Sequence, residues 1–232
     1  MSFAKNQIIR ELTELDTQLL RRKIRSVDSP CGTRIQIGGR ELQAFCSNDY
    51  LGLANHPDLI AALSEGAQRF GVGSGASHLI SGHQTIHDAL EEKLAQTQAL
   101  SIPKAKALFF STGYLANISA ITALSNLKSN ASKIYSAHLN HASLIDGVRL
   151  AKGQNNATVF IFDHHNLVAL EDELKQDFSQ HKLIIIDGVF SMDGDLADLP
   201  ALCGEARLKG AWVMVDDAHG FGPLGATGGG IV

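Results

Sequence analysis

An aspartate and a histidine three residues apart end a strongly apolar segment of this sequence. Asp216 and His219 follow residues 212–215, all of which are large and apolar. An acid at the end of a buried strand must be paired or hydrogen-bonded, and an imidazole beside it is typical of functional sites. The segment therefore predicts part of a site at a strand end. The last lysine of the sequence, Lys209, precedes it.

A second candidate is the start of a predicted helix. Gly113 and Tyr114 follow an apolar segment at 105–110 that we expect to be a strand. The first N–H groups of a helix have no partner within it, and the positive end of its dipole attracts anions such as phosphate. The simpler interpretation is an ordinary helix cap without a ligand.

An imidazole and a hydroxyl follow two more predicted strands. His141 comes after residues 133–136, and Ser191 comes after residues 183–187. Taken alone, such a histidine is more often a packing residue, and such a serine is more often a turn former. Because ligands bind at the carboxyl ends of parallel strands, the four strand ends together favour one site.

Alternating strands and helices must position these residues. Strands that are apolar on both faces, each followed by a helix, indicate an α/β fold with a mostly parallel sheet and helices on both faces. An amphipathic segment at 8–20, with helical spacing, precedes them as an arm or surface helix. We predict strands at 34–37, 42–45, 105–110, 133–136, 158–162, 183–187 and 211–215, and helices at 57–69, 83–98, 113–127, 142–152, 167–174 and 199–209.

The composition excludes several classes of protein. With 44% hydrophobic and 19% charged residues, the chain can bury a substantial core. Its net charge of −4 offers no basic surface for nucleic acid or a membrane, and it has no apolar run long enough to span a bilayer. Three distant cysteines (Cys31, Cys46 and Cys203) indicate neither a disulfide framework nor zinc. Without an apolar signal sequence, a cytoplasmic location is expected.

Other motifs are weaker. The glycine-rich segment at 71–76 fits a dinucleotide-binding pattern but follows a predicted helix instead of a strand. His83 and His87 have metal-ligand spacing, yet the glutamate of a zinc-protease motif is absent, so we predict no metal site. Neither a Gly-x-Ser-x-Gly elbow nor a P-loop is present. We expect the glycine run at 225–230 to be a loop.

Five blocks of the sequence carry a resemblance to a known family. They are Ser47-Asn48-Asp49-Tyr50-Leu51-Gly52-Leu53, Gly73-Ser74-Gly75-Ala76-Ser77 with Ser81-Gly82-His83, Asn140-His141-Ala142-Ser143-Leu144, residues 188–195, and Val215-Asp216-Asp217-Ala218-His219-Gly220. They resemble the α-oxoamine synthases, which are pyridoxal-phosphate enzymes. The resemblance implies the large domain of a fold-type I enzyme, truncated before its last strands and C-terminal domain. It also implies a helical arm with short strands at 1–45 and an incomplete cofactor-binding domain at 46–232.

The resemblance also implies an activity. The most similar member of the family belongs to the biotin pathway and condenses L-alanine with a pimeloyl thioester, on coenzyme A or a carrier protein, with loss of carbon dioxide. Its cofactor is pyridoxal 5'-phosphate, and the enzyme is an acyltransferase that works as a homodimer. Sister enzymes, glycine C-acetyltransferase and 5-aminolevulinate synthase, remain alternatives, as does a non-catalytic fragment.

Roles for the strand-end residues follow from the same resemblance. Asp216 would keep the pyridine nitrogen protonated, since a carboxylate favours the charged form. His141 would stack on the cofactor ring. Ser191 and His219 would hydrogen-bond the ring hydroxyl oxygen.

Further roles concern the phosphate and the substrates. The backbone of Gly113 and Tyr114 would hold the phosphate. Asn48 is a candidate for the carboxylate of the amino acid and Arg21 for that of the acyl substrate, because guanidinium can bind a carboxylate through two hydrogen bonds. Relatives place the lysine that binds the cofactor beyond the Asp216–His219 segment. Since no lysine follows here, we expect this chain alone to be inactive.

Overall fold

The computed structural model describes residues 3–127 and 132–232, which group into two compact units. The N-terminal unit runs to Arg69, and the C-terminal unit runs from Phe70 to Val232. The predicted domain boundary after residue 45 stays a prediction. Within the described part of the chain, no helix is both long and apolar enough to cross a bilayer.

The N-terminal unit carries two helices and a hairpin. They are α1 (Phe3–Thr17), β1 (Arg34–Ile37), β2 (Arg40–Gln43) and α2 (Pro57–Phe70), whose last residue begins the next unit. Strands β1 and β2 pair antiparallel across Gly38 and Gly39. Both glycines have positive φ, as the favoured two-residue hairpin turn requires. This turn fixes the register, so the second strand begins two residues before the predicted 42–45.

Helix α1 begins and ends earlier than its hydrophobic pattern predicted. It ends at Thr17, and Leu19 adopts a left-handed φ of 57° that a continuing helix cannot accommodate. Leu20 and Arg21 therefore lie beyond the helix instead of on it. None of the described residues up to Arg69 is buried, so the N-terminal unit has no core of its own.

The C-terminal unit confirms the predicted α/β architecture. Its elements are the π-helix η1 (His78–Gly82), α3 (Thr85–Gln98), α4 (Gly113–Ser125), β3 (Lys133–Ala137), α5 (Ala142–Asn155), β4 (Thr158–Phe162), α6 (Val168–Gln176), β5 (Lys182–Asp187), α7 (Leu199–Lys209) and β6 (Trp212–Asp216). Four strands form one sheet in the order β4-β3-β5-β6, and every neighbouring pair is parallel. The carboxyl ends of all four strands thus lie at one edge of the sheet.

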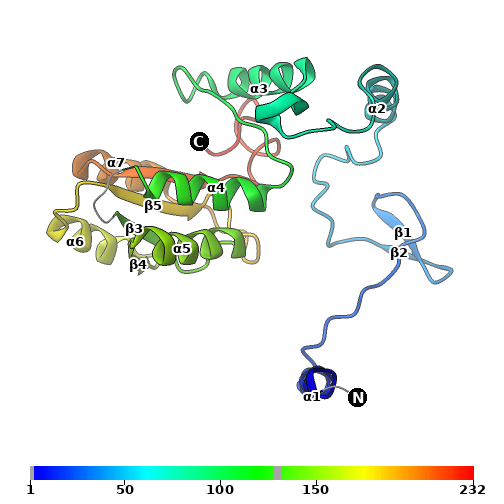
Figure 1. Ribbon diagram of the computed structural model, residues 1–232, viewed down its shortest axis with the longest axis horizontal. Helices are drawn as coiled ribbons and strands as arrows, with labels where there is room; N and C mark the ends of the chain where they lie inside the picture. The colour runs from blue at the N-terminus through cyan, green and yellow to red at the C-terminus, as the bar shows by residue number, and fades with distance from the viewer. Residues whose placement is uncertain (1–2, 128–131) are drawn as a thin grey trace. The chain divides into compact units, whose positions relative to one another are not determined.

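Helices flank this sheet (Figure 1), and two hydrophobic cores lie on its two faces. Alternate side chains of each strand point to opposite faces. Ile134 and Leu183 pack with the apolar residues of α4 and α5. Their neighbours Tyr135 and Ile184 pack with those of α6 and α7 on the other side. This arrangement explains the apolar runs, which predicted a sheet covered by helices on both faces.

The predicted strand at 105–110 is wrong. Its residues form no strand, and Leu108 is 79% exposed. A strand requires ladder partners for its backbone groups. Here the N–H of Phe109 instead donates to the Glu91 carboxylate at 2.8 Å. The apolar, β-prone composition is real, but no described strand pairs with this segment.

Candidate functional site

A cavity of about 320 Å³ lies in the C-terminal unit, at the carboxyl ends of β5 and β6 and the N-terminus of α4. Its lining includes all six residues for which the sequence predicted cofactor contacts: Gly113, Tyr114, His141, Ser191, Asp216 and His219. The strand ends and the start of α4 bring together residues that are up to 106 positions apart in the sequence. Their individual roles stay predictions.

The carboxylate of Asp216 is held by two hydrogen bonds. The side-chain amide of Asn117 donates to Oδ2 at 2.7 Å, and the N–H of Ala218 donates to Oδ1 at 3.0 Å. Asn117 comes from α4 and Ala218 from the turn after β6. The carboxylate therefore has a fixed orientation, as an ionisable group at the end of a core strand needs.

The same asparagine connects Asp216 to the predicted ring-stacking histidine. Its Nδ2 also donates to Ser143 Oγ at 2.9 Å, and this oxygen lies 2.7 Å from His141 Nδ1. The N–H of Ser143 donates to the same Nδ1 at 3.2 Å, as expected for a helix-capping side chain. The network Asp216–Asn117–Ser143–His141 thus orients the imidazole.

Sequence reasoning assigned no role to Asn117 or Ser143, although both line the cavity. A signal was available for each. Asn117 lies one helical turn after Gly113, on the face that the helix start presents to the site. Ser143 lies two residues after His141, within reach of a capping contact.

A second buried acid stands beside Asp216. Asp187 ends β5 as Asp216 ends β6, and the two are paired in register. The Asp187 side chain accepts from the N–H of His141 at 2.8 Å and is 4% exposed. Burial, with the charge of Asp216, raises the pKa of Asp187 to about 7, and the His141 hydrogen bond opposes this shift only in part. The sequence carried the signal for this acid, since both strands end in aspartate.

The start of α4 is built to leave backbone groups available. Thr112 caps the helix by accepting from the N–H of Leu115 at 3.1 Å. A Cβ placed on Gly113 would meet no atom within 4 Å, so protein packing does not require glycine there. The Tyr114 hydroxyl donates to Asp146 at 2.9 Å. The backbone N–H is therefore the donor of Tyr114 that remains for a ligand in the cavity.

The glycine-rich loop at 225–230 lies against Asp217, which lines the cavity, and it is the loop that the sequence predicted. After it, the N–H of Ile231 donates to Asp217 Oδ2 at 3.1 Å. A Cβ on Gly230 would overlap the Asp217 carboxylate, and Gly230 has a φ of +97°. Burial raises the pKa of Asp217. Glycine is needed at 230 because backbone and carboxylate approach each other closely there.

The two predicted substrate-binding residues belong to the N-terminal unit. Arg21 Nη1 pairs with Asp16 Oδ2 at 2.6 Å, and Asn48 Oδ1 lies 3.5 Å from the Tyr50 hydroxyl. Neither lines the cavity of the C-terminal unit. Their substrate contacts stay predictions.

Comparison with known proteins supports the resemblance seen in the sequence. An 8-amino-7-oxononanoate synthase of Bordetella petrii is 52% identical over 221 residues, which are 95% of this chain and 54% of that protein. An 8-amino-7-oxononanoate synthase 2 of Polaromonas sp. is 54% identical over 94% of this chain and 54% of its own length. The chain thus spans about half the length of the curated relatives it matches.

The fold is shared with solved enzymes as well. A serine palmitoyltransferase variant from S. paucimobilis, solved with bound PLP and myriocin, matches with a TM-score of 0.80 and 28% identity. The match covers 99% of this chain and 56% of that one. The model of the family described as aminotransferase class I and II matches residues 40–228. Since this match takes in most of the sequence, including every element that lines the cavity, the chain belongs to the aminotransferase class I and II family.

Proposed function

We propose that this chain forms the cofactor-binding part of an 8-amino-7-oxononanoate synthase. This pyridoxal-phosphate-dependent acyltransferase would condense L-alanine with a pimeloyl thioester and release carbon dioxide, a step of biotin biosynthesis. The observation that carries the proposal is the gathering of six residues, predicted from separate segments of the sequence, around one cavity. The names of relatives about 50% identical support the choice of family member.

The residues around the cavity fit pyridoxal phosphate. A volume of about 320 Å³ suits a small cofactor, since ligand pockets begin at about 300 Å³. The lining offers a helix start for an anion, an oriented carboxylate for a cation and an imidazole for an aromatic ring. When bound, the cofactor would supply an electron sink for charge that develops on the α-carbon of the amino acid.

Each residue would hold a different part of the cofactor. The Asp216 carboxylate would keep a proton on the pyridine nitrogen, and Asn117 would keep that carboxylate in place. The His141 ring, oriented by Ser143, would lie against the cofactor ring. Ser191 and His219 would hydrogen-bond the ring hydroxyl oxygen.

The remaining roles concern charged ends. The backbone N–H groups of Gly113 and Tyr114 would bind the phosphate. Asn48 and Arg21, from the N-terminal unit, would bind the carboxylates of alanine and of the acyl substrate. We further propose that the working enzyme is a homodimer, and the expected cytoplasmic location stays a prediction.

Cofactor binding to the 232-residue chain tests the site directly. Equilibrium dialysis with pyridoxal phosphate should show binding to the chain and to the control Asp193→Asn, whose carboxylate is exposed. Asp216→Asn should weaken binding by about tenfold or more, because a hydrogen bond to a charged group contributes about 1.5–3 kcal/mol. Equal affinities of both variants for pyridoxal phosphate, or no binding to any of the three proteins, would contradict the assignment of this cavity to the cofactor.

The reaction itself requires a separate assay. The protein expressed from its native gene should form 8-amino-7-oxononanoate from L-alanine and pimeloyl-CoA or a pimeloyl carrier protein. Turnover of glycine with acetyl-CoA or succinyl-CoA instead would assign it to a sister enzyme. Cofactor binding without turnover of any of these pairs would indicate a non-catalytic protein.

A further inference from the structure

A buried histidine lies outside the cavity, at the carboxyl edge of the same sheet. His164 is the second residue after β4 and is 6% exposed. Neither of its ring nitrogens has a hydrogen-bond partner among the described residues. Leaving a buried polar group unpaired costs about 1–3 kcal/mol, so such a group calls for an explanation, for example an ion.

Two more ligand atoms converge on one ring nitrogen of His164. Asp195 Oδ2 lies 3.7 Å from His164 Nε2 and 3.3 Å from His165 Nε2. These distances are too long for good hydrogen bonds. They bracket the separation of about 3.4 Å between ligands of a tetrahedral zinc ion with bonds of about 2.1 Å. The three atoms lie within 4.8 Å of one another.

The surroundings of His164 hold its ring in this position. The imidazole stacks on Phe190, with ring centroids 3.8 Å apart. Its other nitrogen, Nδ1, lies 3.9 Å from Asp163 Oδ1, which is beyond hydrogen-bonding distance.

A second histidine cluster in the C-terminal unit is less suitable. His78 Nδ1 and His83 Nδ1 already hydrogen-bond each other at 2.8 Å, and His83 Nε2 pairs with Asp88 at 2.9 Å. His87 Nδ1 accepts from the N–H of Gln84. These nitrogens have hydrogen-bond partners, whereas those of His164 have none in the part of the chain that the structure describes.

We propose that His164, His165 and Asp195 form a Zn²⁺ site. One carboxylate and two imidazoles suit zinc, and His165 and Asp195 are open enough to solvent for water to complete a tetrahedron. The inference is independent of the proposed function, because it uses none of the residues assigned to the cofactor.

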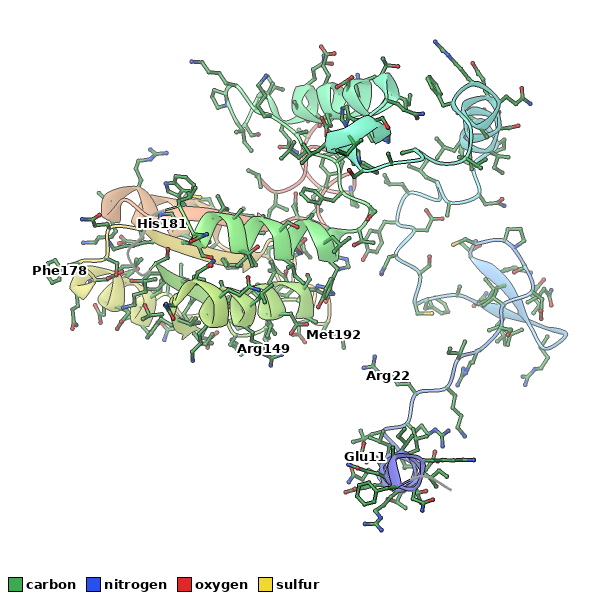
Figure 2. The ribbon with its side chains drawn as sticks, in the orientation of Figure 1. Glu11, Arg22, Arg149, Phe178, His181 and Met192 are labelled. Carbon is green, nitrogen blue, oxygen red and sulfur yellow. The ribbon has the colours of Figure 1, made fainter. Side chains whose placement is uncertain are left out.

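The site would tie the end of β4 to the loop that follows β5. That loop is a tight turn, in which Phe190 N–H donates to Asp195 O at 2.9 Å and Gly194 N–H donates to Phe190 O at 2.8 Å. This loop contains Ser191 and the exposed Met192, and Met192 is labelled in Figure 2. Zinc bound to Asp195 would therefore restrain the loop that presents Ser191 to the cavity.

Metal titration of the 232-residue chain tests the proposal. After chelator treatment, the chain should bind about one Co²⁺, with the visible absorption of a tetrahedral complex, and Zn²⁺ should displace it. His165→Gln and Asp195→Asn should weaken binding by roughly tenfold or more. The two side chains are exposed by 61% and 40%, so we expect both variants to fold, and circular dichroism checks this.

The matched control is His83→Gln, in the other histidine cluster. This variant should bind Co²⁺ as the unaltered chain does. Loss of binding in His83→Gln alone would place the metal at the other cluster and overturn the proposal. Absence of Co²⁺ binding, or equal affinity in all variants, would also overturn it.

Discussion

At the scale of single residues, the most consequential feature is the pair of acids at neighbouring strand ends. Asp187 and Asp216 are paired in register, and the buried Asp187 has its pKa raised from 3.8 to about 7. A raised carboxyl pKa favours the protonated form in the folded state. The protonated Asp187 side chain therefore stabilises the folded state fully below about pH 4. This contribution to the free energy of unfolding is lost as the pH rises to about 7.

The Asp187→Asn substitution tests this linkage. Asparagine keeps an acceptor for the His141 N–H but cannot ionise. Relative to the unaltered chain, the variant should gain stability between pH 4 and pH 8, by at most about 4 kcal/mol. Urea unfolding at a series of pH values measures the difference. The exposed control Asp193→Asn should show no such trend. A difference in unfolding free energy that stays constant with pH for Asp187→Asn would contradict the raised pKa of Asp187.

At the scale of elements, one asparagine joins two strands beneath the site. Asn140 is 4% exposed and donates to Ser136 Oγ at 3.0 Å and to Ile185 O at 2.9 Å. Its Oδ1 accepts from the N–H of Asp187 at 2.9 Å. The residue thus fixes the end of β3 against β5 and sets the position of His141, which follows it.

Asn140→Ala should lower the free energy of unfolding by about 2–4 kcal/mol, because buried backbone groups of β5 lose their partners. Denaturant unfolding measures the loss. Gln154→Ala, on the exposed side of α5, serves as the control and should change stability by less than about 0.5 kcal/mol. A similar, small change in both variants would show that Asn140 does not join the strands.

The start of α4 yields a second prediction at this scale. A methyl group at Gly113 would meet no protein atom within 4 Å, and alanine is a better helix former than glycine. Gly113→Ala should therefore leave stability unchanged or slightly higher while it weakens pyridoxal-phosphate binding. Thermal unfolding and equilibrium dialysis measure the two effects. Unchanged cofactor affinity would exclude a close approach of the phosphate to this backbone.

At the scale of the whole molecule, the sequence contains no lysine after Asp216. The resemblance to the α-oxoamine synthases places the lysine that binds the cofactor, and acts as the base, in that later part. We therefore predict that the 232-residue chain alone forms no ketone product from L-alanine and a pimeloyl thioester. Mass spectrometry of the reaction mixture measures this, and product above the level of an Asp216→Asn control would refute the prediction.

The sequence alone determined most of the fold and the candidate site. Apolar runs and helical patterns are local, so they predicted the strands at 158–162 and 183–187 and the helix at 199–209 within a residue or two. Because all parallel strands end at one sheet edge, residues at strand ends also predicted a common site. His141, Ser191 and Asp216 do line one cavity.

Tertiary structure decided what depends on contacts between distant segments. The segment at 105–110 has the composition of a strand, but a strand requires a neighbour, which composition does not encode. Asn117 and Ser143 became part of the site only when α4 and α5 packed on the same face of the sheet. His164 and Asp195, 31 residues apart, meet because the parallel strands β4 and β5 end at the same edge of the sheet. Such contacts are set by packing in three dimensions, so a local pattern can indicate a candidate residue but not the distant residue that it meets.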